Sequence, residues 1–244
     1  MDNLPTNRAN SRARILASVR ASLQGARHLP AAPEVTLAPP AVFAPDTLSG
    51  TPQSPLVAQF AAELQQLSGT FLSMPAGEVA GWVGQLLAQR GVNEILAWQA
   101  ADLPVPNLLD ELQKGGTTVL DGVLPPDEPG RSQALTRVQA ATIGLTGADA
   151  AFAETGTLAL QAGPGRPRLA SLSVRTHIAL LDPARLYPSW ASWLAAEGPQ
   201  AAERLTSASN LTLITGPSRT GDIEMTLTVG VHGPGEVIVI LVSR

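Results

Sequence analysis

From residue 56 onward, short apolar runs alternate with longer stretches in which apolar residues recur at helical spacing. The short runs predict β-strands, and the periodic stretches predict amphipathic helices. This alternation is typical of an α/β fold, in which helices flank a mostly parallel sheet and connect its strands. The final run, 237–242, is apolar throughout and rich in β-branched residues, as expected for a strand buried on both faces. The predicted helices span 56–67, 76–89, 107–114, 131–141, 183–196 and 199–207, and the predicted strands span 70–72, 94–98, 117–120, 175–181, 211–215 and 237–242.

Residues 222–229 fit two interpretations. Their apolar and polar side chains alternate, which is the pattern of a half-buried strand. Against this, Thr220 suits a helix N-cap, and Asp222 and Glu224 are favourable in a first helical turn. Gly230 suits the position just after a helix. A parallel connection to the final strand also requires a crossover, which is usually helical, so we predict a helix over this segment.

The N-terminal part predicts a basic amphipathic helix within residues 1–27, followed by a proline-rich linker, residues 28–55, and the α/β domain, residues 56–244. Ile15 and Val19 recur at helical spacing on one face. Three roles are open to this helix: packing on its own domain, docking onto an acidic partner surface, or binding a membrane surface. Because the linker separates it from the body, we expect a docking element. Its arginines are Arg8, Arg12, Arg14, Arg20 and Arg27.

Composition excludes several classes of protein. The 244 residues, 44% of them hydrophobic, suffice for one substantial α/β domain. No apolar run approaches the roughly 20 residues that span a bilayer, and the N-terminus lacks the apolar segment of a secretory signal, so we expect a cytoplasmic protein. Because the chain has 0 cysteines and 3 scattered histidines, we expect neither a thiolate-bound iron–sulfur cluster nor a zinc site. The net charge of −4 argues against nucleic acid as a partner.

A glycine turn rich in hydrogen-bond donors follows the strand predicted at 211–215. Gly216 permits a tight turn and the close approach of a ligand. Ser218, Arg219 and Thr220 supply donors that suit an oxygen-rich anion. The alternative is a tight turn with a helix cap and no ligand, and position along the chain alone does not decide between the two.

A second glycine turn, Glu154-Thr155-Gly156-Thr157, joins two apolar extended runs. The pattern predicts a hairpin whose turn presents a carboxylate and two hydroxyl groups. Glu154 is the one acid in this apolar stretch, where its neighbours could bury it. In such a place it either acts as a general base or nucleophile, or accepts backbone hydrogen bonds in the turn.

Loops at the ends of strands commonly carry function, and His232 lies in such a loop just before the final strand. In an open α/β sheet, turns beyond the carboxyl ends of the strands converge on one crevice, so we predict that Glu154 and Arg219 face a shared pocket. The loop 163–168 adds two arginines that could reach an anionic ligand. The predicted catalytic residue is Glu154; the predicted ligand-binding residues are Thr155, Gly156, Thr157, Gly216, Ser218, Arg219, Thr220, Asp222, Glu224 and His232; we predict no metal ligands.

The second half of the chain contains four phrases in a fixed order: GADAAFAETGTLAL, RTHIALL, NLTLITGPSRTGDIE and GVHGPGEVIVILV. In this order and spacing they resemble the LUD-domain family, specifically its lactate-utilisation protein C (LutC) type. The resemblance implies a fold like that of the NagB, ribose-5-phosphate isomerase and CoA-transferase group. It also implies a role in the cytoplasmic oxidation of L-lactate to pyruvate, alongside iron–sulfur LUD-family and Cys-rich partner subunits.

Three functions are compatible with these residues. The first, favoured by the resemblance, is a non-redox subunit of an L-lactate dehydrogenase (oxidising) complex that binds an organic acid or a related anion while iron–sulfur partners carry the electrons. The second is a free-standing CoA-transferase-like or sugar-phosphate isomerase-like enzyme that uses Glu154. The third is an assembly protein without its own active site. In each case we expect no cofactor held by this chain itself.

Overall fold

The computed structural model describes residues 13–21, 54–200, 203, 205–206, 208–221, 227–229 and 232–243. The chain divides into two compact units, Met1–Pro40 and Ala41–Arg244, and each is described by itself. In the first unit, residues 13–21 form a helix within the stretch predicted to be helical, with Ile15, Leu16 and Val19 exposed on it. Most of the proline-rich linker lies outside the described residues.

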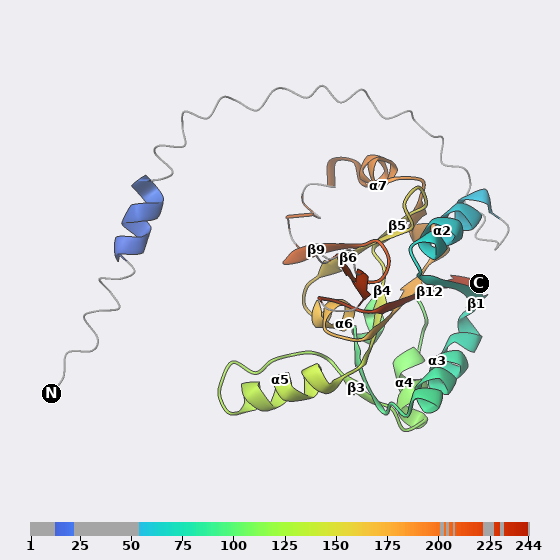
Figure 1. The fold of residues 1–244 in the computed structure, drawn as a ribbon, viewed down its shortest axis with the longest axis horizontal. Coiled ribbons are helices and arrows are strands. Elements are labelled where there is room, and N and C mark those ends of the chain that lie inside the picture. The colour runs from blue at the N-terminus through green and yellow to red at the C-terminus, as the bar shows by residue number, and fades with distance from the viewer. Residues whose placement is uncertain are drawn as a thin grey trace. The chain divides into compact units, whose positions relative to one another are not determined.

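A six-stranded parallel sheet forms the centre of the second unit (Figure 1). Its strands are β1 Thr70–Pro75, β2 Glu94–Ala97, β3 Thr118–Leu120, β4 Ile143–Gly147, β7 Thr176–Leu181 and β12 Glu236–Ser243. Their order is β1-β12-β7-β4-β2-β3, and every neighbouring pair is parallel. This confirms the predicted α/β class. The apolar run of β12 is buried throughout, because this strand lies between β1 and β7 and is covered on both faces.

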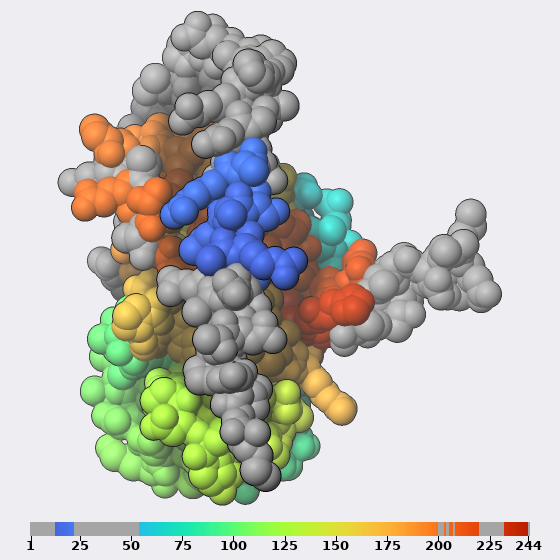
Figure 2. All heavy atoms as spheres, turned by 90° about the vertical axis from the view of Figure 1, so that its left-hand side faces the viewer, coloured from blue at the N-terminus to red at the C-terminus, as the bar shows by residue number. Residues whose placement is uncertain are grey.

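Helices connect and cover these strands (Figure 1). They are α2 Pro55–Gln66, α3 Ala76–Arg90, α4 Leu108–Lys114, α5 Gly130–Ala140, α6 Leu169–Leu172 and α7 Trp190–Glu197. On α2, Phe60 and Leu64 are one helical turn apart and both are buried, so the apolar face seen in the sequence does face the core. α7 and α5 lie at opposite ends of the unit (Figure 2). Within the described part of the chain, no helix is long and apolar enough to cross a membrane.

A second sheet packs beside the parallel one and was not distinguished from it in the sequence. Its strands are β5 Ala150–Phe152, β6 Thr157–Ala162, β8 Leu186–Tyr187 and β9 Asn210–Ile214, in the order β8-β5-β6-β9. Ala151 and Leu158 belong to the main core, whereas Phe152 packs with Trp193 of α7 in a smaller core on the other face. The sheet is therefore a layer between the parallel sheet's core and α7.

Three sequence predictions are corrected here. The strand predicted at 211–215 is β9, but it pairs antiparallel with β6 in the second sheet and not with the parallel strands. The stretch 183–196 is not one helix: a 3-10 turn, Pro183–Arg185, and β8 precede α7, since Pro188 interrupts the pattern. β4 was not recognised as a separate strand.

The helix predicted over 222–229 is wrong where the structure describes this segment. β10, Arg219–Gly221, pairs antiparallel with β11, Leu227–Val229. The argument for a crossover helix assumed that the strand at 211–215 lay in the parallel sheet, and β9 does not. The alternation of apolar and polar side chains was therefore the better guide; residues 222–226 lie outside the described part of the chain.

Candidate functional site

The turn between β5 and β6 carries Glu154 and Thr155, and both side chains are exposed. The backbone amide of Ala153 donates to the carbonyl of Tyr187 (2.9 Å), and the amide of Glu154 donates to the carbonyl of Pro188 (3.0 Å). These hydrogen bonds hold the turn against the segment that follows β8. The hairpin forms as predicted, and its turn lies at one end of the second sheet, where Glu154 is exposed.

Two glycines bring two distant turns against one end of α2. Gly156 has a φ of 60°, and a Cβ there would lie 2.5 Å from the backbone nitrogen of Leu64. Gly216 has a φ of 86°, and a Cβ there would lie 2.9 Å from the Cβ of Leu67. Both positions need glycine for the backbone conformation and for the close contact. The turns meet at the C-terminal end of α2, and we call this place the two-turn site, comprising residues 67–68, 154–157 and 215–219.

The two-turn site lies at an edge of the second sheet and not at the carboxyl edge of the parallel sheet. β8 is parallel to β5, and both β5 and β9 are antiparallel to β6, so β5, β8 and β9 run in one direction. Their carboxyl ends carry Glu154, Pro188 and Thr215 in turn. Strand ends do converge on the predicted residues, but in a sheet that the sequence pattern did not resolve.

A row of three hydroxyl groups links the two turns. Thr157 Oγ1 lies 2.8 Å from Thr155 Oγ1 and 2.9 Å from Thr215 Oγ1, and either oxygen of each pair can donate. The register of β6 with β9 pairs Leu158 with Ile214 and so places Thr157 beside Thr215. Thr157 is buried, while Thr155 at the other end of the row is exposed. Thr215 was not among the predicted site residues, although it directly precedes the turn glycine.

Arg219 contacts the same end of α2. Its Nη2 donates to the carbonyl of Leu67 and to Ser68 Oγ, the latter at 2.9 Å. No described residue accepts from its Nη1 or Nε. The side chain is exposed, and among the described residues the guanidinium is anchored through Nη2 alone. The structure thus gathers Thr155, Gly156, Thr157, Gly216 and Arg219 around the end of α2.

The loop before β12 lies next to the Gly216 turn. The amide of Ser218 donates to the carbonyl of Pro234 (2.8 Å), and a Cβ on Gly233 would lie 3.3 Å from the Cβ of Ser218. His232 begins this loop and is exposed. Of the other predicted residues, Thr220 is described only as part of β10, and Asp222 and Glu224 lie outside the described residues.

Sequence reasoning missed the main polar cluster at the carboxyl edge of the parallel sheet. Arg166 lies between Asp102 (2.6 Å) and Asp149 (2.7 Å), with its guanidinium 5.1 Å from the ring centre of Trp98. Burial opposes the charge of Arg166, but hydrogen bonds and attraction from the two carboxylates outweigh it and raise its pKa. Arg166 is therefore held within the fold by these ion pairs, so of the two arginines in the loop 163–168 it is not the one free to reach an anionic ligand.

His177 is an interior histidine of the parallel sheet. It is completely buried, and its Nε2 lies 2.8 Å from Thr146 Oγ1. No described residue forms a hydrogen bond with Nδ1. Desolvation lowers the pKa of His177 to about 4, so the ring is neutral at pH 7.

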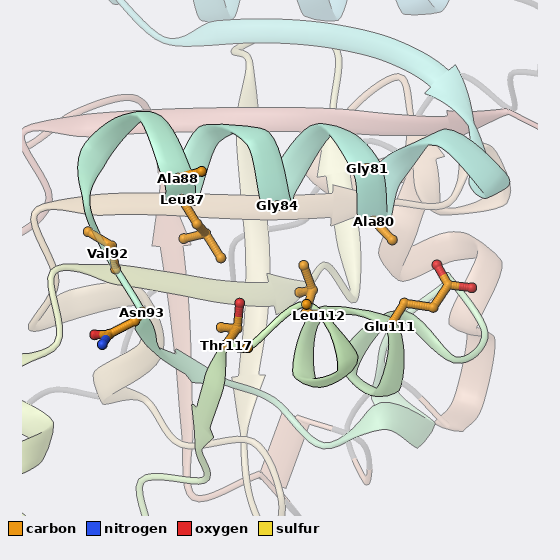
Figure 3. Close-up of a pocket in the computed structure, with 12 residues that line it drawn as sticks. Ala80, Gly81, Gly84, Leu87, Ala88, Val92, Asn93, Glu111, Leu112 and Thr117 are labelled. Carbon is orange, nitrogen blue, oxygen red and sulfur yellow. The ribbon is translucent and has the colours of Figure 1, made fainter.

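Two hollows lie away from the two-turn site. A groove of about 350 Å³ runs between α3 and α4, with Leu87, Leu112 and Glu111 on its walls (Figure 3). A second hollow of about 530 Å³ lies at the amino ends of β2, β4 and β7, beside Arg90 and Arg175. Neither is lined by a predicted site residue. Among the described residues, no group of three or more His, Cys, Asp or Glu side chains could hold a metal ion.

Comparisons with known proteins agree with the four sequence phrases. The Lactate utilization protein C of an Exiguobacterium strain is 43% identical over 102 residues, which are 42% of this chain and 44% of that protein. The Lactate utilization protein C of Macrococcus caseolyticus is 26% identical over 197 residues, covering 81% of this chain and 82% of its own length. The matched segment thus spans less than half of the first relative and most of the second.

The fold has a solved counterpart. The crystal structure of a DUF162 family protein from Deinococcus radiodurans superposes with a TM-score of 0.52 and 23% identity, covering 77% of this chain and 96% of that one. The LUD domain family matches residues 57–242, which include both sheets and every described residue of the two-turn site. The chain therefore belongs to the LUD domain family.

Proposed function

We propose that this chain takes part in lactate utilisation as a non-redox subunit of a cytoplasmic lactate-oxidising system, and that it binds an organic acid or a related anion at the two-turn site. The relatives from Exiguobacterium and Macrococcus caseolyticus carry the name Lactate utilization protein C, and this supports the general role. Membership of the LUD domain family supports the same assignment.

The non-redox part of the proposal rests on composition. Oxidation of lactate to pyruvate releases two electrons, which need an acceptor. With 0 cysteines, this chain has no thiolates to hold an iron–sulfur cluster. The electrons would pass to clusters on partner subunits, an iron–sulfur LUD-family protein and a Cys-rich protein, while this chain contributes binding and orientation.

The ligand class follows from the donors at the two-turn site. The Nη1 group of Arg219, from which no described residue accepts, suits a carboxylate because a charge-assisted hydrogen bond from a guanidinium is short and strong. Thr155, the exposed end of the hydroxyl row, can form a hydrogen bond with the hydroxyl or carbonyl oxygen of the same small acid. Glu154 lies beside Thr155 at the same turn, where its carboxylate can accept the proton of a bound hydroxy acid. The observation that carries the proposal is the meeting of both turns at the end of α2.

The test is a lactate-oxidation assay on the complex purified with its partners, with and without this chain. Omission of the chain should abolish pyruvate formation. Arg219→Lys should lower the rate about tenfold, because an ammonium does not reproduce the planar guanidinium that reaches Leu67, Ser68 and the acid together. Arg131→Lys, a matched change at an exposed arginine of α5, should leave the rate unchanged.

Two other results would redirect the assignment. Full activity without this chain would exclude it from lactate oxidation. If the chain is required but Arg219→Lys and Glu154→Gln both keep the full rate, its role is assembly, and the two-turn site has no part in binding the acid.

A further inference from the structure

Ser68 occupies a backbone position that ordinarily belongs to glycine. Its φ is 66°, in the left-handed region. Its amide donates to the carbonyl of Gln65 (2.9 Å), and the amide of Gly69 donates to the carbonyl of Leu64 (2.9 Å). This pair of bonds is the Schellman motif that ends α2, and Ser68 holds its left-handed position. A serine there carries a steric cost that glycine avoids.

The hydroxyl of Ser68 gives a reason for accepting that cost. Ser68 Oγ accepts from Arg219 Nη2 at 2.9 Å, and the same Nη2 donates to the carbonyl of Leu67. A glycine at this position would keep the Leu67 contact and lose the second acceptor. With one acceptor, the guanidinium can rotate about that bond; with two, its plane is fixed.

We propose that Ser68 is a positioning residue of the two-turn site: together with the Leu67 carbonyl it holds Nη2 of Arg219, so that the guanidinium keeps one orientation in which Nη1 can donate to a small carboxylate. Strain at a residue that also orients a ligand-binding group is characteristic of functional sites. The inference rests on the proposed function, because it assumes that the anion binds at Arg219. The simpler alternative is that Arg219 only caps the C-terminal end of α2, for which the Leu67 carbonyl suffices.

Three substitutions separate the hydroxyl from the backbone strain. Ser68→Gly relieves the left-handed strain and removes the acceptor. Ser68→Ala keeps the strain and removes the acceptor. Ser68→Asn relieves much of the strain, since asparagine tolerates this conformation, and restores an acceptor through its side-chain oxygen.

The experiment measures melting temperature and pyruvate affinity of the full chain for the wild type and all three variants. Melting temperature should follow the strain: higher for Ser68→Gly and Ser68→Asn than for Ser68→Ala. Affinity should follow the acceptor: close to wild type for Ser68→Asn and about tenfold weaker for Ser68→Gly and Ser68→Ala. Equal affinity in all four proteins, or affinity that follows melting temperature, would overturn the positioning role.

A second readout does not depend on the ligand. In ¹⁵N NMR spectra, Arg219 should give slowly exchanging Nη2 protons in the wild type and Ser68→Asn, and averaged signals in Ser68→Gly and Ser68→Ala. If the wild type binds neither pyruvate nor L-lactate, the proposed function fails, and this readout alone decides whether Ser68 fixes Arg219. Unchanged Arg219 signals in Ser68→Gly would then refute the inference.

Discussion

The parallel sheet and the second sheet use their polar side chains differently. At the carboxyl edge of the parallel sheet, Arg166 forms ion pairs with Asp102 and Asp149, and within the sheet His177 is hydrogen-bonded to Thr146. At the edge of the second sheet, Thr155 and Glu154 are exposed. Arg219, which contacts the C-terminal end of α2, has donors on Nη1 and Nε from which no described residue accepts.

The two regions therefore have different roles: the parallel sheet supports the fold, and the edge of the second sheet presents groups for binding. Buried polar groups that bind one another stabilise the fold, and their burial keeps them from a ligand. Exposed donors of a side chain that is anchored through one nitrogen cost the fold little and can bind a ligand. Substitutions in the parallel sheet should therefore change stability, and substitutions at the two-turn site should change binding.

The largest contrast is expected between two aliphatic side chains. Ile240 of β12 is completely buried, so Ile240→Ala should lower the free energy of unfolding by about 4 kcal/mol through lost burial and a cavity. Leu213 of β9 is 51% exposed, and Leu213→Ala should lower it by about 0.5 kcal/mol. Urea unfolding monitored by circular dichroism measures both. Similar losses in the two variants would contradict the division into core and edge.

His177 should give the parallel sheet an acid-sensitive stability. Its pKa in the folded chain is about 4, below the ordinary value of 6.5, so between these two pH values the ring is protonated in the unfolded chain and neutral in the folded chain. Its contribution to the free energy of unfolding is complete above pH 6.5 and is lost as the pH falls towards 4. The loss should reach about 3 kcal/mol. His177→Gln, which does not titrate, should show a flatter dependence of unfolding free energy on pH between 4 and 6.5; an unchanged slope would exclude His177 as the cause.

Arg166 and Arg90 form a matched pair of ion-pair tests. Arg166→Ala leaves Asp102 and Asp149 close together and largely buried without a countercharge, and should cost about 2 kcal/mol of unfolding free energy. Arg90→Ala breaks a more exposed pair with Glu236 and should cost less than about 1 kcal/mol. Thermal unfolding of the two variants measures the difference. Equal losses of unfolding free energy in the two variants would show that burial gives the Arg166 cluster no advantage over the surface pair.

A smaller loss of stability than in Ile240→Ala or Arg166→Ala is expected at the hydroxyl row. Thr157→Val keeps the side-chain shape and removes the contacts to Thr155 and Thr215, so it should cost about 1 kcal/mol. Pyruvate binding should nevertheless weaken severalfold. Thr212→Val, on β9 outside the two-turn site, breaks a comparable bond to Asn210 and serves as the control. If both variants bind pyruvate as the wild type does, the hydroxyl row is structural.

Much of the parallel sheet was predictable because its strands are buried on both faces. The apolar run of β12 and the apolar face of α2 follow from hydrophobic pattern alone. β9 was placed in the wrong sheet, because strand pairing depends on distant partners and leaves no local signal. The same error produced the helix predicted over 222–229, where Leu227–Val229 is a strand.

The two turns were found from residue type, but their surroundings were not. Gly156 and Gly216 stood out as turn glycines among polar residues, and both contact α2. The role of Ser68 could not be predicted from the sequence, because it depends on a left-handed backbone conformation and on an arginine more than a hundred residues away. Asp102, Asp149 and Arg166 were missed for the same reason, since three separate loops bring them together.

The most direct test of the account is a titration of the ¹⁵N-labelled full chain with pyruvate, followed by amide chemical shifts. The account predicts concentration-dependent shifts at Thr155, Gly156, Thr157 and Gly216, and none at Gly84 or Gly115 in the groove between α3 and α4. In Arg219→Ala the same amides should shift only at about tenfold higher pyruvate. Shifts confined to the α3–α4 groove, or shifts that Arg219→Ala leaves unchanged, would contradict binding at the two-turn site.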